Sequence, residues 1–231
     1  MGTQISFRFQ RLNGSRSCDV EVHNLIIAGW TGRDQAALEA HIKELEELGI
    51  APPKRTPMFY RLSASLLTAA PAIQVIGGDS SGEVEFVLLK HQEELWVGVG
   101  SDHTDRKVEA LGVTLSKQMC PKPLAPEMWA LADVEPHWDE LILRSYTISD
   151  GKTTLYQEGK VSAIRAPREI LKLHVRLTGG EMAPGTAMFC GTFSVIGGIR
   201  SASTFGMEIE DPVLGRRIVH SYHVEPLAIE G

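Results

Sequence analysis

Cysteine is scarce in this chain of 231 residues. Cys18, Cys120 and Cys190 are odd in number and lie far apart in the sequence, so they indicate neither a disulfide framework nor a zinc site. Free thiols are typical of a reducing compartment, and we therefore expect a cytoplasmic protein.

Excess positive charge and long apolar runs are also lacking. The net charge is -6 and no stripe of lysine and arginine occurs, which argues against nucleic acid as a partner. No apolar run has the length that spans a membrane. Residues 1–12 alternate polar and apolar side chains, which predicts a strand rather than a signal peptide. With 43% hydrophobic and 23% charged residues, the composition is that of an ordinary globular protein. We expect any chemistry to be that of a cytosolic protein acting on a small molecule.

Several motifs that mark common enzyme classes are missing. The chain contains no H-E-x-x-H, no Walker loop and no G-x-G-x-x-G. His220 and His223 are three residues apart in a segment that we expect to be a strand, where odd spacing puts the two rings on opposite faces. The sequence therefore does not predict a zinc site there.

Short strands dominate the predicted secondary structure. A helix is expected over 34–48, where Leu38, Ile42 and Leu45 form an apolar stripe and Asp34 is a suitable N-cap. A second helix is expected from Pro167 to about residue 176. The expected strands are 3–12, 19–29, 72–76, 83–90, 94–99, 140–147, 187–190, 204–210 and 216–224. A β-rich barrel or roll follows.

The segment from Ser81 to Leu89 carries the most informative pattern. Side chains alternate along a strand, so Glu83 and Glu85 point the same way at the start of an apolar run. At roughly 5 Å and an effective dielectric of about 20, two carboxylates repel each other by about 3 kcal/mol. A hard divalent cation would offset this repulsion. The alternative is a strand end with both carboxylates in water, where the repulsion is screened.

Other candidate residues are ambiguous when taken singly. Asp102 could be a third oxygen ligand or an ordinary turn residue. His41 and Glu44 are neighbours on one helix face and could form a general base oriented by a carboxylate, or a surface ion pair. Lys117 lies near a proline-rich loop, where most lysines are solvated.

The order of these pieces resembles the fumarylacetoacetate hydrolase superfamily over about residues 25–220. That family carries H-x-x-E on a helix, a proline-containing connection, E-x-E on a strand, D-x-[ST]-x-R, a lysine, a short helix and P-G-[DT] followed by G-T. The matching segments are His41 to Glu44, Pro53 to Phe59, Glu83 to Glu85, Asp102 to Arg106, Lys117, the helix near Glu169, and Pro184 to Thr186 with Gly191-Thr192. The segments Gly100 to Arg106 and Ser116 to Pro121 resemble a little-characterised subgroup, labelled a domain of unknown function.

The resemblance implies an α+β, β-rich fold: a mixed β-roll over residues 56–231 with a small N-terminal lobe, 1–55, that holds a lid helix. It implies a homodimer and a divalent metal, Mg²⁺ with Mn²⁺ or Ca²⁺ as alternatives. The site residues that it implies are the metal ligands Glu83, Glu85 and Asp102, the catalytic residues His41, Glu44 and Lys117, and the substrate-binding Thr192.

Three departures from the family pattern, at residues 107, 109 and 193, limit what the resemblance implies about the substrate. Glu109 stands where the family usually has glutamine, which removes a donor and adds negative charge beside the site, so we assign Glu109 to the substrate-binding residues. Lys107 and Phe193 also replace common family residues. The metal ligands are retained, whereas the substrate can differ.

The leading hypothesis is a metal-dependent hydrolase that cleaves a C–C bond in a 2-oxo acid or acylpyruvate-like substrate through a metal-chelated enolate. One alternative is isomerisation, decarboxylation or dehydration of a related 2-oxo or sugar acid. Another is a metabolite-binding protein that keeps the fold without catalysis.

Overall fold

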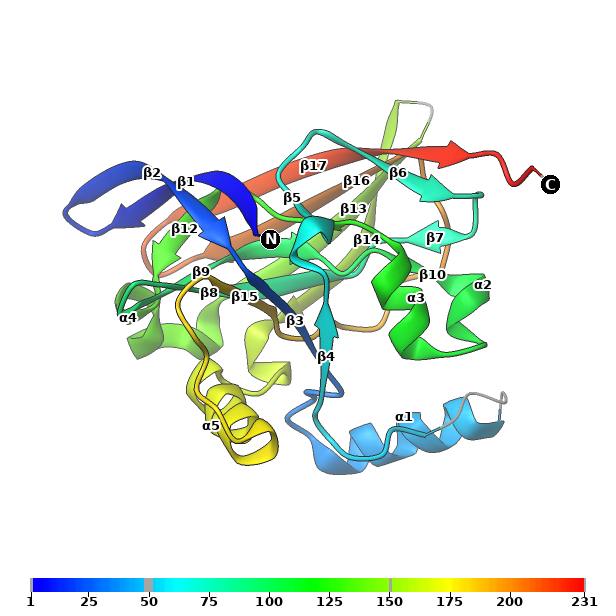
Figure 1. Ribbon diagram of the computed structural model, residues 1–231, viewed down its shortest axis with the longest axis horizontal. Coiled ribbons are helices and arrows are strands. Elements are labelled where there is room, and N and C mark those ends of the chain that lie inside the picture. The colour runs from blue at the N-terminus through cyan, green and yellow to red at the C-terminus, as the bar shows by residue number, and fades with distance from the viewer. Residues whose placement is uncertain (1, 48–51, 150, 231) are drawn as a thin grey trace.

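The computed structural model describes residues 2–47, 52–149 and 151–230. Two β-sheets form its body, and short helices lie at their edges (Figure 1). The larger sheet has eight strands in the order β2-β1-β12-β9-β8-β15-β3-β4. Their bounds are β2 (Gly14–Val22), β1 (Thr3–Arg11), β12 (Glu127–Ala130), β9 (Glu94–Ser101), β8 (Val84–His91), β15 (Thr186–Phe189), β3 (Asn24–Gly29) and β4 (Met58–Leu62).

The smaller sheet has five strands in the order β14-β13-β16-β17-β6. These are β14 (Lys152–Lys160), β13 (Ile142–Ser149), β16 (Thr204–Asp211), β17 (Arg216–Leu227) and β6 (Ala72–Ile76). Two short ladders join β7 (Ser80–Ser81) to β10 (Thr104–Asp105) and β5 (Leu67–Thr68) to β11 (Lys122–Pro123). Parallel pairs, β1 with β12, β3 with β15 and β6 with β17, make both sheets mixed.

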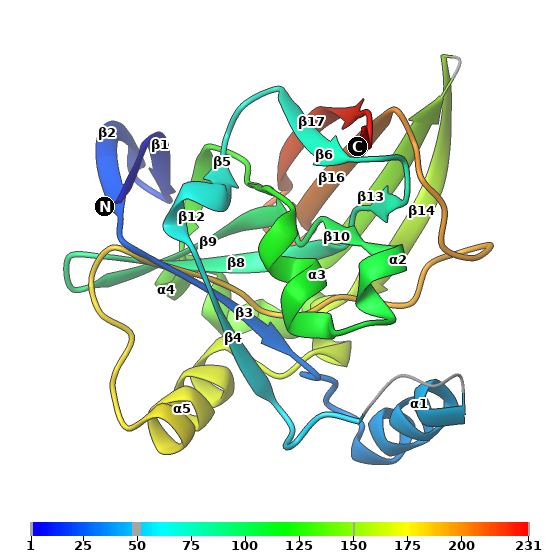
Figure 2. The same cartoon turned by 45° about the vertical axis from the view of Figure 1, so that its right-hand side comes forward.

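Helices fill the connections between strands. The α-helices are α1 (Gln35–Glu47), α2 (Arg106–Glu109), α3 (Val113–Met119), α4 (Leu131–Val134) and α5 (Pro167–Thr178). The 3₁₀ helices are η1 (Ala64–Leu66), η2 (Glu135–Glu140) and η3 (Val161–Ala163). Helices α2 and α3 lie beside β10, close to the open end of the β8–β9 hairpin, where Val84 pairs with Ser101 (Figure 2). This helical pair is what brings charged side chains to that end of the hairpin.

Strand β8 is apolar on both faces because it separates two hydrophobic cores. Phe86 packs in the core that also holds Phe205 and Met207 of the smaller sheet. Val87 and Leu89 face the other core, which the curled larger sheet encloses together with Phe9. Burying each such side chain contributes about 1.5–3 kcal/mol, so the position of β8 is strongly fixed. The expected β-rich α+β fold is confirmed.

Both helices that the sequence predicts are present. Asp34 Oδ1 accepts hydrogen bonds from the backbone N–H groups of Ala36 and Ala37, at 2.9 and 3.1 Å, and so caps α1. Helix α5 has Pro167 in its first turn and ends at Thr178, with Gly179 as its C-cap. Gly179 adopts a left-handed φ of 79° and its N–H bonds to the carbonyl of Val175, a common way to end a helix. Residue 48, the expected end of the first helix, lies outside the described residues.

The strand predictions differ from the structure near the N-terminus. The expected strand 19–29 is two strands, β2 and β3, and β2 already begins at Gly14. Residues 14–17 are exposed, so they lack the apolar alternation that predicts a strand; pairing with β1 forms it instead. The sequence pattern does not predict strands β4, β12 and β14. The division at residue 55 stays a prediction, although β1 and β3 belong to the same sheet as β8 and β9.

Candidate metal centre

The β8–β9 hairpin brings the three predicted ligand carboxylates together. In the antiparallel register Val84 lies opposite Ser101 and Glu85 opposite Gly100, so Asp102 follows β9 beside the start of β8. The backbone N–H of Asp102 donates to the carbonyl of Glu83 at 2.9 Å. One carboxylate oxygen from each of Glu83, Glu85 and Asp102 lies within 4.8 Å of the other two. Strand pairing thus gathers residues that are 19 positions apart at most.

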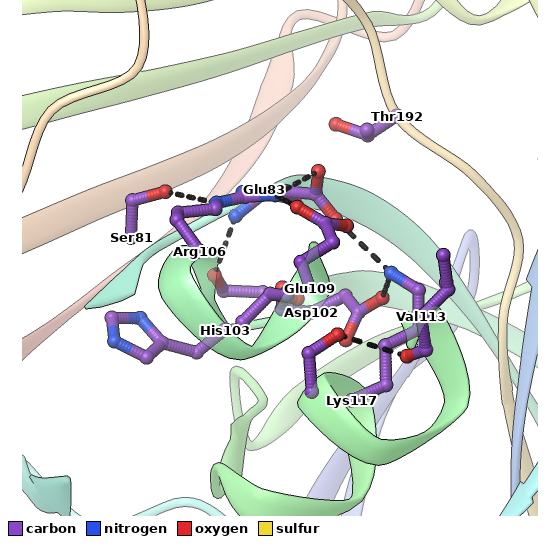
Figure 3. Close-up of polar contacts among 12 residues, drawn as sticks. Ser81, Glu83, Asp102, His103, Arg106, Glu109, Val113, Lys117 and Thr192 are labelled. Atoms are coloured by element: carbon purple, nitrogen blue, oxygen red, sulfur yellow. Dashed lines mark hydrogen bonds and ion pairs between the residues drawn. The ribbon is translucent and has the colours of Figure 1, made fainter. Parts of the chain in front are cut away.

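Two lysines converge on Asp102 from different elements. Lys117, on α3, donates to Asp102 Oδ2, and its Nζ lies 3.3 Å from Glu83 Oε2 (Figure 3). Lys122, on β11, places Nζ 2.9 Å from Asp102 Oδ1 and donates to the carbonyl oxygen of His103. The sequence resemblance indicated Lys117, whereas nothing in the sequence pattern singled out Lys122.

Arg106 holds the more exposed side of the site. Its NH1 lies 3.1 Å from Glu83 Oε1 and 2.9 Å from Glu109 Oε2, and its Nε donates to Ser81 Oγ at 2.7 Å (Figure 3). The structure places the Glu109 carboxylate on Arg106, which also contacts Glu83. The assignment of Glu109 to the substrate-binding residues stays a prediction. Arg106 is the last residue of the D-x-[ST]-x-R motif, and the sequence pattern alone does not indicate its role.

These contacts set the charge states of two of the carboxylates. Burial by itself would raise the pKa of Asp102, but Lys117 and Lys122 outweigh it and hold the pKa at about 2. Burial also opposes ionisation of Glu83, and Arg106 and Lys117 lower its pKa below the usual value. Both groups are therefore carboxylates at neutral pH.

Glu85 is in a different situation. The residue is 2% exposed, and it makes no ion pair with any residue in the part of the chain that the structure describes. Oε2 accepts a hydrogen bond from the backbone N–H of Gly191 at 2.7 Å. Burial, followed by the charge of Asp102, raises the pKa of Glu85 well above its usual value. Within the triad, Glu85 is the carboxylate that still needs positive charge.

A divalent cation fits this donor set. Three carboxylates supply hard oxygen ligands, which suit Mg²⁺, Mn²⁺ or Ca²⁺ better than zinc. Asp102 Oδ1 is buried, and its one ionic contact among the described residues is with Lys122 Nζ at 2.9 Å. Glu85 lacks a cationic partner there, so a cation would supply the positive charge that Glu85 needs. It would share Glu83 and Asp102 with the ammonium of Lys117.

Thr192 lies above the carboxylates (Figure 3). Its hydroxyl donates to the carbonyl of Val84 at 2.7 Å and accepts from Gln157 Nε2 at 2.9 Å. Gln157 Oε1 also accepts from the backbone N–H of Val84 at 2.9 Å. These bonds tie the 191–193 segment to β8, and Thr192 can offer a substrate only its remaining acceptor capacity.

A buried polar network surrounds His103, the residue that follows Asp102. His103 Nδ1 lies 3.0 Å from the hydroxyl of Tyr222, and Nε2 lies 2.8 Å from Ser80 Oγ. Burial, with the positive charge of Lys122, lowers the pKa of His103 to about 3. A neutral imidazole fully engaged on both nitrogens is a structural support for the loop after β9. No local sequence pattern predicts such long-range partners.

His41 and Glu44 belong to α1 by their backbone, and their side chains lie outside the described part of the structure. Their assignment as a catalytic pair therefore stays a prediction. A cleft of about 610 Å³ lies elsewhere on the molecule, between η2 and the start of α5, and none of the three carboxylates lines it. No helix among the described residues is long and apolar enough to cross a membrane.

Comparisons with solved structures identify the fold. The chain matches Cg1458, solved with an inhibitor, with a TM-score of 0.65 and 16% identity over 94% of this chain and 82% of that one. It matches yeast ynq8, a fumarylacetoacetate hydrolase family protein, with a TM-score of 0.62 and 17% identity over 89% and 94% of the two chains. Both identities are low, so these matches establish the fold alone.

A third match concerns 2-keto-3-deoxy-D-arabinonate dehydratase, solved with magnesium and 2,5-dioxopentanoate. Its TM-score is 0.63, with 14% identity over 94% of this chain and 78% of the dehydratase. No curated protein matches the sequence. One family model covers residues 28–222 and carries the description "Protein of unknown function (DUF2848)". The chain therefore belongs to the DUF2848 family, and it has the fold of fumarylacetoacetate hydrolase family proteins.

Proposed function

We propose that this chain is a divalent-metal-dependent enzyme that cleaves a C–C bond in a 2-oxo acid or acylpyruvate-like substrate by hydrolysis. The observation that supports it most is the convergence of Glu83, Glu85 and Asp102 within 4.8 Å, with the ammonium of Lys117 beside them. We further propose Mg²⁺ as the metal, with Mn²⁺ or Ca²⁺ as alternatives, and a cytoplasmic homodimer as the working form.

Each residue has a distinct part in this proposal. Glu83, Glu85 and Asp102 would hold the metal, which when bound supplies a Lewis acid for adjacent oxo and carboxylate oxygens. The ammonium of Lys117 stabilises negative charge that develops on the substrate oxygen. His41, oriented by Glu44, takes a proton from water. The lobe 1–55, with α1 as a lid, excludes bulk water from the site.

A second function has support of its own. The dehydratase that shares this fold was solved with magnesium and 2,5-dioxopentanoate, so dehydration of a 2-oxo sugar acid is chemistry that the fold accommodates. Isomerisation and decarboxylation of 2-oxo acids also develop enolate charge on the substrate, which the same site would stabilise. In these reactions His41 would move a proton within the substrate rather than activate water.

Product analysis distinguishes these reactions. The purified protein with Mg²⁺ is screened against acylpyruvates, oxaloacetate and 2-keto-3-deoxy acids. Hydrolysis of an acylpyruvate predicts two products, a carboxylic acid from the acyl group and a 2-oxo acid. With labelled water, ¹⁸O should enter the new carboxylate of the first product. Only isomerised, dehydrated or decarboxylated products would rule out the hydrolase. Ligand binding without any turnover would support the metabolite-binding alternative.

A further inference from the structure

The candidate site has a buried side and a partly exposed side. The side chains of Asp102 and Lys122 are 0% exposed. Those of Arg106, Glu83 and Glu109 are 15%, 17% and 22% exposed. A ligand that enters from solvent therefore meets Arg106, and the two carboxylates that hold it, before it reaches the deeper groups.

Arg106 is already occupied by the protein's own carboxylates. A guanidinium that faces a binding site is a common partner for a substrate carboxylate. Here the same nitrogen, NH1, contacts both Glu83 and Glu109, at 3.1 and 2.9 Å. Asp105 fixes this arrangement, because its side chain caps α2 through the N–H of Val108 at 2.9 Å, and α2 carries Arg106 and Glu109.

The two ammonium groups near the triad are engaged as well. Lys122 pairs with Asp102 and the carbonyl of His103, and Lys117 pairs with Glu83 and Asp102. Together with Glu85 and Glu109, the site holds four carboxylates against three cationic side chains. When a divalent cation is bound and all four carboxylates are ionised, the site carries an excess of one positive charge, which a single substrate carboxylate neutralises.

We infer that the site selects 2-oxo acids with one carboxylate and a neutral remainder, and that Glu109 is the residue that excludes dicarboxylates. Glu109 acts in two ways: it occupies the NH1 group of Arg106, which a second carboxylate could otherwise use, and it repels that carboxylate directly. This selectivity rests on the function proposed above, since it concerns the same site.

The test compares two acids that differ only in the terminal group. 2-Oxopentanoate and 2-oxoglutarate have the same length, and the second carries an additional carboxylate. Calorimetry with Mg²⁺ present is expected to show 2-oxopentanoate binding at least about tenfold tighter to the wild type, because like charges oppose the dicarboxylate. Glu109→Gln is expected to tighten 2-oxoglutarate binding by about tenfold while leaving 2-oxopentanoate within about threefold.

Glu93→Gln is the matched control. Glu93 lies in the turn of the β8–β9 hairpin, at the end away from Glu85, and its side chain is 94% exposed. The variant removes the same charge and should keep the wild-type preference. Equal binding of the two acids by wild type, which needs no variant, overturns the inference. So does an unchanged ratio in a folded Glu109→Gln protein.

Failure of the proposed function gives a different result. If Mg²⁺ alone does not bind to the wild type, and neither acid binds with it, both the function and the selectivity are wrong. If Mg²⁺ and both acids bind without discrimination, the metal-dependent function stands and only the role of Glu109 is wrong. Binding of Mg²⁺ is measured by calorimetry on the metal-free protein before either acid is added.

Discussion

The Nζ atom of Lys122 lies 2.9 Å from Oδ1 of Asp102, and neither side chain has any exposed surface. Lys122 also donates to the carbonyl of His103, the residue after Asp102. It therefore holds both the side chain and the backbone of the loop that follows β9. With Lys117 on the other carboxylate oxygen, it orients Asp102 between two ammonium groups. We regard Lys122 as the residue that positions this carboxylate.

Lys122→Met should strongly destabilise the protein, because it leaves a buried carboxylate with one cation fewer. Removing one partner of a buried ion pair typically costs about 3–5 kcal/mol, and urea unfolding of the metal-free protein measures this loss. The double variant Lys122→Met with Asp102→Asn is the control. It removes both charges and should regain part of the lost stability. Equal stability of Lys122→Met and the wild type would contradict the positioning role.

Glu85 and Glu83 should respond in opposite ways to replacement by glutamine. Glu85 has no cationic partner among the described residues and an elevated pKa, so Glu85→Gln should leave the metal-free protein equally or more stable. The amide oxygen can still accept the hydrogen bond from Gly191. Glu83 contacts Arg106 and Lys117, so Glu83→Gln should destabilise by about 1–3 kcal/mol.

Magnesium should make the wild type more stable than both glutamine variants. At a concentration about 100 times Kd, a ligand of the native state adds about 2.7 kcal/mol to the free energy of unfolding. The wild type should show this gain, whereas both glutamine variants should lose most of it. Metal analysis after dialysis gives an independent measurement. Equal metal content of wild type and Glu85→Gln would contradict a metal site at the triad.

Metal binding should release a proton. Burial and the charge of Asp102 raise the pKa of Glu85 well above its usual 4.5, so the metal-free folded protein keeps this carboxyl protonated over a pH range where the unfolded chain does not. The contribution of Glu85 to the free energy of unfolding therefore falls as pH rises from 4.5 to the raised pKa. Ligation requires the carboxylate, so Mg²⁺ affinity should rise through the same range.

Calorimetry in buffers of different ionisation enthalpy counts the protons released when Mg²⁺ binds to the wild type. About one proton should be released at a pH below the raised pKa of Glu85, and none above it. The pH dependence of stability that comes from Asp102 has the opposite sign. Its pKa is lowered from 3.8 to about 2, so its contribution to stability is present above 3.8 and is lost as pH falls toward 2. Proton release that does not change with pH would assign the proton to another group.

Gly191 should not tolerate a side chain. Its φ is 108°, a conformation that residues with a Cβ atom rarely adopt, and a Cβ there would lie 1.9 Å from Thr31 Oγ1. Gly191→Ala should therefore lower the free energy of unfolding by more than the roughly 1–3 kcal/mol of backbone strain alone. It should also shift the backbone N–H that donates a hydrogen bond to Glu85. Gly198→Ala is the control, since Gly198 has a φ of 86° and a Cβ there would meet nothing within 4 Å. Equal losses of stability in the two variants would show that the contact with Thr31 is unimportant.

The sequence was sufficient wherever the chemistry is local. The apolar run of β8 predicts a strand buried on both faces, and strand alternation puts Glu83 and Glu85 together. Asp34, Pro167 and the apolar stripe of α1 predict the two longer helices because capping and periodicity act within a few residues. The order of short motifs was enough to indicate the fumarylacetoacetate hydrolase fold, which the structural matches confirm.

Exposed or edge elements were harder to predict. The first half of β2 carries polar residues, and its strand conformation depends on hydrogen bonds from β1. Helix α3 is short and holds a buried lysine, a residue that is almost always solvated. Its burial becomes favourable only when Asp102 and Glu83 are placed opposite it by a different part of the chain.

By itself, therefore, the sequence determined the two longer helices, the buried strand β8 and the residues of the candidate triad. Only the tertiary structure decided which of the three carboxylates are neutralised by the protein and which is not. Lys122, Arg106 and Glu109 reach the site from β11 and α2, and the balance of charge depends on distances between these elements. Coulomb energies vary with separation and burial, and neither quantity is encoded in a local pattern of residues.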